Sequence, residues 1–314
     1  MSFVSWDPRV DDDEFSSNGA YSSVVVPSDV KIPLLDRDAW EMYPAYQHLY
    51  NKLHVSRTSG IRSNLIGAAR SPTRYPVIVR PVYNLFGMGH GTTRVSMPME
   101  FEQLDCSGYF WAEHLNGAHV SWDIALVKGD IKWLQTWIGH KHSSMSPGVF
   151  SRWSTQEASP ASERNVEDWV SKNLQEFTGM VNLETIGGKV IECHLRVGDA
   201  LYMGDPDLLQ AIVNLYSTGE WDFNCTLNDF HMFPIWVARN ESSRWPSNEA
   251  KEEIMGIVKE SADVYMVEVD DDWPGDPVNF LRVMFLGFEE YSKGKEVSEK
   301  ITKLFEKPLM HITV

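Results

Sequence analysis

The chain has 314 residues, 43% of them apolar and 12% aromatic, which is enough for about two domains with real cores. Its 28 basic and 44 acidic residues give a net charge of −16, which argues against a nucleic-acid backbone held by bulk electrostatics. Three scattered cysteines, Cys106, Cys193 and Cys225, indicate neither a disulfide framework nor a cysteine zinc site, and they favour the reduced cytoplasm. We also expect no signal peptide and no membrane span, because no basic-then-apolar leader and no long apolar run is present.

The first 45 residues are expected to form an N-terminal arm, because they are largely polar, acidic and rich in serine. The segment that follows has aromatic and aliphatic residues at helical spacing, so we predict a helix from about 45 to 58, ended by Gly60. Lys52 lies on this helix.

A glycine-rich segment comes next. Residues 75–83 are an apolar, β-branched run that carries Arg80, which predicts a strand that delivers a cation to a defined place. Gly87, Gly89 and Gly91 then occupy every second position, a spacing that lets backbone amides approach an anion closely. The pattern predicts a phosphate-binding loop. The alternative is a hairpin whose turn happens to be rich in glycine.

Three further strands are predicted before residue 142. Residues 108–115 form an aromatic strand, and Asn116-Gly117 is the strongest short turn signal in the chain. Residues 119–141 alternate through another hairpin that turns at Lys128-Gly129-Asp130. Residues 143–165 are rich in Ser and Pro and predict a mobile loop.

A short amphipathic helix is predicted over residues 166–177, followed by two strands joined at Gly187-Gly188. The first strand carries Glu184. The second alternates two sets of side chains, in which Glu192, His194 and Arg196 share one face while Ile191, Cys193, Leu195 and Val197 share the other.

The polar face of this strand has two interpretations. It is either a solvent-facing side of an antiparallel sheet or a divalent-cation site, because a lone buried carboxylate is costly. In the second case Glu192 and Glu184 supply oxygen ligands, and Arg196 binds an anionic substrate. His194 fits magnesium less well than an amide oxygen would.

The C-terminal part is predicted to contain both helices and strands. A helix is predicted over residues 206–216. Strands at 233–239, 264–270 and 279–289, helices at 248–261 and 295–305, and a last strand at 309–314 follow in the order βαββαβ. This order is typical of ferredoxin-like α+β domains.

The order of these pieces resembles the ATP-grasp superfamily over about residues 46–205. YPVIVRP with GMGHG is similar to the first hairpin of that family, with Arg80 in place of its phosphate-binding Lys or Arg. NKL around Lys52 resembles the basic element upstream of that hairpin. WAEHLNGAHVSWDIAL resembles the hinge, which places Glu113, His114 and Leu115 at the edge of the adenine.

FTGMVNLETIGGKVIECHLR resembles the metal-binding hairpin of the family, with Glu192 and Arg196 in register. Two departures are visible. His194 stands where the family usually has Asn, and the hairpin is shorter than usual. Only about 45 residues precede the grasp, where a substrate domain is common, so we expect the acceptor pocket to be built by the C-terminal part or by another subunit of a homo-oligomer.

The resemblance implies an α+β, ATP-grasp fold with a C-terminal ferredoxin-like domain. The expected division is an arm at 1–45, the two grasp subdomains at 46–115 and 116–229, and the last domain at 230–314.

The resemblance also implies an ATP- and Mg²⁺-dependent ligase that joins a small-molecule carboxylate to an amine or similar nucleophile. Lys52, Arg80 and the amides of Gly87, Gly89 and Gly91 would bind phosphates; Glu184, Glu192 and His194 would bind metal; and Arg80 and Arg196 would be catalytic. Two alternatives stay open: a catalytically silent nucleotide-binding module, and a structural or partner-binding protein.

Overall fold

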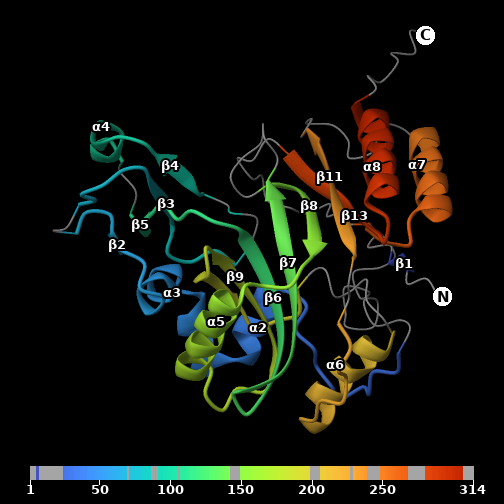
Figure 1. Ribbon diagram of the computed structural model, residues 1–314, viewed down its shortest axis with the longest axis horizontal. Helices are drawn as coiled ribbons and strands as arrows, with labels where there is room; N and C mark the ends of the chain where they lie inside the picture. The colour runs from blue at the N-terminus through green and yellow to red at the C-terminus, as the bar shows by residue number, and fades with distance from the viewer. Residues whose placement is uncertain are drawn as a thin grey trace.

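The computed structural model describes residues 5–6, 24–68, 71–85, 89, 91–104, 107–141, 149–198, 206–226, 229–238, 248–267 and 280–306. These residues form a nine-stranded sheet with the order β1-β12-β13-β11-β8-β7-β6-β9-β10 and a four-stranded sheet with the order β2-β5-β3-β4. The small sheet lies to one side of the large one (Figure 1). Helices and mostly antiparallel strands confirm the expected α+β class.

The small sheet is antiparallel and contains β2 (Ser63–Leu65), β3 (Val77–Pro81), β4 (Thr93–Val95) and β5 (Tyr109–Glu113), with the short helix α4 (Pro98–Glu102) after β4. The strand predicted around Arg80 is therefore confirmed as β3. Val77 and Val79 pack with Trp111 on one face of this sheet. Because strand side chains alternate, Arg80 leaves β3 by the opposite face.

The large sheet has two groups of strands, which are continuous with each other. The first comprises β6 (His119–Val127), β7 (Asp130–Lys141), β8 (Phe150–Thr155), β9 (Gly179–Ile186) and β10 (Lys189–His194). The second comprises β11 (His231–Ala238), β12 (Val264–Val267) and β13 (Phe280–Phe288), with β1 (Ser5–Trp6) parallel to β12.

The turn between β6 and β7 confirms the hairpin predicted there. Lys128 and Gly129 have φ angles of 52° and 81°. Both lie in the left-handed region that a two-residue hairpin turn needs to match the twist of its strands.

The chain turns at Asn116-Gly117, as the sequence predicts. Because β5 belongs to the small sheet and β6 to the large one, this dipeptide is the crossing between the two sheets. Gly117 has a φ of 118°, and a Cβ atom on it would lie 2.8 Å from Gly187 Cα. The crossing therefore packs directly against the turn between β9 and β10.

The helices are α2 (Asp36–Met42), the 3-10 helix η1 (Pro44–Tyr50), α3 (Lys52–Thr58), α5 (Pro160–Asn173), α6 (Pro206–Thr218), α7 (Asn248–Ser261) and α8 (Tyr291–Glu306). The single helix predicted at 45–58 is divided at Asn51. The Asn51 side chain accepts a hydrogen bond of 2.9 Å from the His54 backbone N–H. Asn51 therefore caps the start of a new helix and does not continue the preceding one. Lys52 thus stands at the first turn of α3.

The loop predicted at 143–165 contains more structure than expected: β8 and the first turns of α5 lie within it, and residues 142–148 lie outside the described ranges. Ser159 accepts a hydrogen bond of 3.2 Å from the Ser162 backbone N–H, and Pro160 follows at the first helical position. This cap and proline are a helix-start signal within a Ser- and Pro-rich segment.

Helices cover both faces of the first group of strands in the large sheet. On one face Trp169 and Val170 of α5 pack against Trp122 and Leu183. On the other face Ile212 of α6 packs in a cluster with residues of β6, β7 and β9. Each fully buried side chain of this size contributes about 1.5–3 kcal/mol.

The C-terminal strands pack against α7 and α8, which lie beside β11 and β13 (Figure 1). The described order is β11, α7, β12, β13, α8. The strand predicted at 309–314 lies outside the described residues, so the ferredoxin-like domain and the four domain boundaries stay predictions. Within the described ranges, no helix has the length and hydropathy needed to cross a membrane.

Candidate functional site

Three charged side chains from three elements meet between the two sheets. Arg80 Nη1 of β3 lies 2.8 Å from Glu192 Oε1 of β10, and Lys52 Nζ of α3 lies 2.6 Å from Glu192 Oε2. Arg80, Lys52 and Glu192 are 7%, 5% and 9% exposed. Each oxygen of the carboxylate therefore has its own buried cation.

Local backbone features bring these groups together. The Lys52 backbone N–H donates to the Val82 carbonyl at 2.8 Å, which ties the start of α3 to the end of β3. The register of β10 against β9 shifts between Val190 and Glu192, which is a β-bulge at Ile191. Arg80 Nη2 donates to the Ile191 carbonyl at 2.6 Å.

The bulge also corrects one sequence prediction. Ile191 was expected on the same face as Cys193 and Leu195. Cys193 and Leu195 belong to the main core, whereas Ile191 packs with residues of the small sheet and α3. Strict alternation fails there because the bulge adds one residue to β10.

Three further contacts extend the charged cluster. His194 Nε2 lies 3.5 Å from Glu192 Oε2, and His194 Nδ1 lies 2.9 Å from Asp36 Oδ2. Arg196 Nε lies 3.1 Å from Asp36 Oδ1. Lys52, Arg80, Glu192, His194, Asp36 and Arg196 thus form one chain of alternating charge, here called the ion-pair cluster.

The cluster shifts the pKa values of Glu192 and His194. Burial opposes the ionisation of Glu192, but Lys52, His194 and Arg80 outweigh it and hold the pKa of that carboxyl well below its usual value. Burial also disfavours the charged form of His194, yet Asp36 and Glu192 raise its pKa to about 9. The imidazole is therefore a cation at neutral pH.

These contacts do not fit a magnesium site. Both oxygens of Glu192 are bound by cations, and Glu184 Oε2 lies 2.9 Å from His119 Nε2. Among the described residues, no group of three or more His, Cys, Asp or Glu side chains is arranged to hold a metal ion. Glu184, Glu192 and His194 are therefore not assembled into the expected ligand set.

The predicted phosphate loop is described in part, because Gly87 lies outside the described residues. Gly89 and Gly91 have φ angles of 65° and 71°, and the Thr92 backbone N–H donates to the Gly89 carbonyl at 2.9 Å. A Cβ atom at Gly91 would lie 2.8 Å from the Tyr109 hydroxyl oxygen. Gly91 is needed where the loop passes closely over β5.

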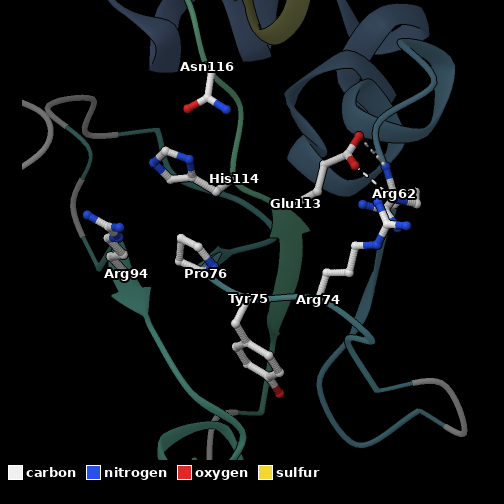
Figure 2. A pocket seen from close by; sticks show the side chains of 8 residues that line it. All are labelled: Arg62, Arg74, Tyr75, Pro76, Arg94, Glu113, His114 and Asn116. Atoms are coloured by element: carbon white, nitrogen blue, oxygen red, sulfur yellow. Dashed lines mark hydrogen bonds and ion pairs between the residues drawn. The ribbon is translucent and has the colours of Figure 1, made fainter.

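Two of the three predicted adenine-edge residues line a pocket instead of joining the ion-pair cluster. Glu113 and His114 border an open pocket of about 340 Å³ beside the crossing between the sheets (Figure 2). We call it the arginine pocket, and its lining is Arg62, Arg74, Tyr75, Pro76, Arg94, Glu113, His114 and Asn116. Leu115 packs elsewhere, in the apolar cluster that contains Leu53.

Sequence reasoning missed Asp36, which belongs to the ion-pair cluster. Asp36 is 4% exposed and binds both His194 and Arg196, although it lies in the segment predicted as an N-terminal arm. Its position at the start of α2 is a weak signal, since carboxylates favour the first turn of any helix.

No protein-family model matches the sequence, and no curated protein matches it either. Solved structures do match. An L-amino acid ligase from Bacillus licheniformis aligns with 94% of this chain and 84% of its own, at 13% identity and a TM-score of 0.60. An N5-carboxyaminoimidazole ribonucleotide synthetase from Thermotoga maritima aligns with 86% of this chain and 78% of its own, at 10% identity and a TM-score of 0.56.

A phosphoribosylamine–glycine ligase from Thermotoga maritima aligns with 82% of this chain and 77% of its own, at 12% identity and a TM-score of 0.52. All three are ligases of the ATP-grasp superfamily. The chain has the ATP-grasp fold. In this chain the small sheet and the edge of the large sheet are joined at the ion-pair cluster. At these identities the likeness establishes the fold alone.

Proposed function

We propose that this protein is an ATP-dependent ligase that activates a carboxylate for attack by an amine or a similar nucleophile. Support comes from the ATP-grasp fold together with the meeting of Lys52 and Arg80 between the sheets. Two buried cations that converge from different elements are suited to neutralise the β- and γ-phosphates of a nucleotide. This convergence is the observation that carries the proposal.

The reaction needs no protein nucleophile. An oxygen of the substrate carboxylate attacks the γ-phosphorus, ADP leaves, and an acyl phosphate forms. The amine then attacks the carbonyl carbon, and inorganic phosphate leaves with the bond electrons while the amine loses a proton. Lys52 and Arg80 would bind the transferring phosphoryl oxygens, and Arg196 would orient the substrate carboxylate.

Glu192 must first give up its contacts with Lys52 and Arg80. A triphosphate carries more charge than one carboxylate, so it competes for the same two cations. The present arrangement of Glu184, Glu192 and His194 does not fit magnesium, so we derive no step through that ion.

ATP turnover tests the proposal. ADP release should be measured with ATP, Mg²⁺ and a panel of amino acids, in the wild type and in Arg80→Ala and Arg80→Lys. We expect turnover in the wild type, loss of it in Arg80→Ala and partial retention in Arg80→Lys, because the charge is kept while the bidentate fork is lost. Circular dichroism should show that both variants are folded. Equal turnover in all three proteins would contradict the proposal.

A second candidate is a nucleotide-binding module that does not turn over ATP. It is favoured by the saturation of Lys52 and Arg80 by Glu192, and by the missing metal-ligand group among the described residues. A rise in melting temperature with ATP but no ADP release would favour this candidate, because a ligand that binds only the native state stabilises it.

A further inference from the structure

Asp36 is the deeper of the two carboxylates in the ion-pair cluster, and it comes from a helix outside the two sheets. Its side chain is 3% exposed, whereas the side chain of Arg196, which it binds, is 14% exposed. Burial opposes the ionisation of Asp36, but Arg196 and His194 outweigh it and lower the pKa of the carboxyl. Asp36 is therefore an anion at neutral pH, placed deeper than the arginine that it binds.

Apolar packing on both sides fixes the position of Asp36. Ile32 is 5% exposed and packs in the cluster that contains α6, and Ala39 is fully buried in the main core. Between them the Asp38 carboxylate accepts a hydrogen bond of 3.0 Å from the Leu35 backbone N–H, which fixes the start of α2. The place of Asp36 is therefore set by features other than its own ion pairs.

The backbone around Arg196 is fixed as well. The Leu195 backbone N–H donates to the Tyr50 hydroxyl at 3.2 Å, and the Gly198 backbone N–H donates to the Asp123 carboxylate at 3.0 Å. A Cβ atom at Gly198 would lie only 2.2 Å from Asp123 Oδ1, so the chain passes very close to this carboxylate. These contacts determine where the long side chain of Arg196 begins.

Two further contacts determine the direction of the Arg196 guanidinium. Its Nε lies 3.1 Å from Asp36 Oδ1, and its Nη1 donates to the Val197 carbonyl at 2.8 Å. Because a guanidinium is planar, two held nitrogen atoms set the orientation of the whole group. Loss of the Asp36 carboxylate would remove the charged contact and return rotamer freedom to a long side chain.

The described members of the ion-pair cluster have an excess of positive charge. They comprise two carboxylates and four cationic side chains, namely Lys52, Arg80, His194 and Arg196. An excess of two positive charges attracts an anion, even in a chain whose net charge is −16. Arg196 has the most exposed side chain of the six, so it is the member that an arriving carboxylate reaches first.

We propose that Asp36 is a positioning residue, which holds the Arg196 guanidinium in the orientation that binds the substrate carboxylate. Asp36 acts through Arg196 and does not itself contact the substrate, because it lies deeper in the protein. This inference rests on the proposed ligase activity and deepens it, since it assigns a role to a residue of α2 that the proposed reaction does not otherwise use.

The test is steady-state ADP release with Mg²⁺, in which ATP and the amino acid with the highest turnover are varied in turn. In Asp36→Asn we expect the KM for the amino acid to rise about tenfold and the KM for ATP to change less than about twofold, because Arg196 loses a charge-assisted contact while Lys52 and Arg80 keep theirs. Asp36→Glu keeps the charge and should show a smaller rise. A merely structural role would not separate the two KM values.

The matched control is Glu41→Gln, which removes an exposed carboxylate from the same helix and should leave both KM values unchanged. Circular dichroism should show that the variants are folded. If Asp36→Asn does not fold, Asp36→Glu decides: a rise in the KM for the amino acid alone supports the proposal, and two unchanged KM values overturn it. Equal KM values for the amino acid in the wild type and a folded Asp36→Asn also overturn it.

A readout without turnover separates this proposal from the ligase activity. The Arg196 Nε–H resonance, assigned in NMR spectra with Arg196→Lys, should exchange slowly with water in the wild type and faster in Asp36→Asn, because a buried, hydrogen-bonded N–H is protected. Equal exchange overturns the proposal. A wild type that releases no ADP refutes the ligase activity, and calorimetry with the same amino acids then decides: weaker binding to Asp36→Asn supports the positioning role, and equal or absent binding overturns it.

Discussion

Arg80 of β3 and Glu192 of β10 are 112 positions apart in sequence and 2.8 Å apart in space. β10 is the edge strand of the nine-stranded sheet, and β3 lies inside the four-stranded sheet. Their ion pair therefore joins the two sheets at a buried point. Any movement that separates the sheets must expose or re-pair these charges, which couples an opening of the interface to the arrival of a replacement anion.

The first prediction concerns Glu192→Gln, which leaves Lys52 and Arg80 without their shared counter-charge. Removing one partner of a buried ion pair costs about 3–5 kcal/mol, and we expect a loss of this size in the free energy of unfolding. Urea denaturation at pH 7 measures it. Glu167→Gln on the exposed side of α5 is the control and should change stability by less than about 0.5 kcal/mol. Similar losses in both variants would show that the cluster does not stabilise the fold.

The second prediction is the pH dependence contributed by His194. Its pKa of about 9 lies above the ordinary value of 6.5, so the folded state binds the proton more tightly than the unfolded chain does. This contribution to stability is fully present below pH 6.5 and is lost as the pH rises through 9. This contribution to the free energy of unfolding is about 3 kcal/mol, obtained by converting the rise of the His194 pKa from 6.5 to about 9 into free energy.

Imidazole resonances in NMR titrations give the measurement. His194 should stay protonated past pH 8, whereas His140, whose pKa is lowered by burial and by Arg152, should titrate below 6.5. In parallel, the unfolding free energy of the wild type should fall between pH 7 and 9 more steeply than that of His194→Asn. A midpoint for His194 near its ordinary value would refute the buried contact with Asp36.

The outcome at β10 shows how far sequence reasoning reached. The alternation of side chains along a strand predicted that Glu192 and His194 share a face, and their side chains do lie 3.5 Å apart. This prediction succeeded because alternation follows from the backbone and does not depend on which side chains are present. The bulge at Ile191 was missed, since one extra residue leaves no mark in a pattern of apolar and polar positions. Asp36 was missed for another reason: its contacts are tertiary, and its own segment is mostly polar.

The turn at Asn116-Gly117 shows what local sequence leaves open. Local sequence specifies that the chain must turn there, and Gly117 does adopt a positive φ. Whether the next strand pairs with the previous one depends on partners far along the chain, and here β6 pairs with β7 and β9 instead. Turn residues predict a change of direction, and tertiary pairing decides the sheet.

The third prediction concerns Asp123 of β6, which is 1% exposed. Its carboxylate accepts hydrogen bonds from Trp137 Nε1 at 3.0 Å, Asn182 Nδ2 at 2.9 Å and the Gly198 backbone N–H at 3.0 Å. Burial outweighs these donors and raises the pKa of Asp123 to about 6. The folded state therefore holds the proton more tightly, so this group lowers stability as the pH rises from about 4 to 6.

The Asp123→Asn variant should lack this dependence of the unfolding free energy on pH. The wild type should lose about 3 kcal/mol across that pH window from this group, as the size of the shift implies. The variant has one acceptor oxygen for three N–H donors, so it should also show a constant loss of about 1–3 kcal/mol from an unpaired donor. Chemical denaturation of both proteins from pH 4 to 8 separates the two effects. Parallel curves would mean that Asp123 ionises normally.

The last prediction compares two glycines with similar backbones and different surroundings. Gly60 and Gly187 have φ angles of 68° and 58°, so alanine at either position costs about 1–2 kcal/mol in left-handed conformation. A Cβ atom at Gly60 would meet nothing within 4 Å, whereas one at Gly187 would overlap the Asn116 carbonyl oxygen.

Gly187→Ala should therefore destabilise the protein by at least about 1 kcal/mol more than Gly60→Ala, because overpacking against backbone cannot be relieved by a rotamer change. Thermal and urea unfolding of the two variants measure the difference. The turn at Gly187 and the crossing at Asn116 touch where the chain passes from one sheet to the other, so the excess cost reports how firmly the two sheets are fixed at this point. Equal losses would mean that the crossing can move away from the hairpin.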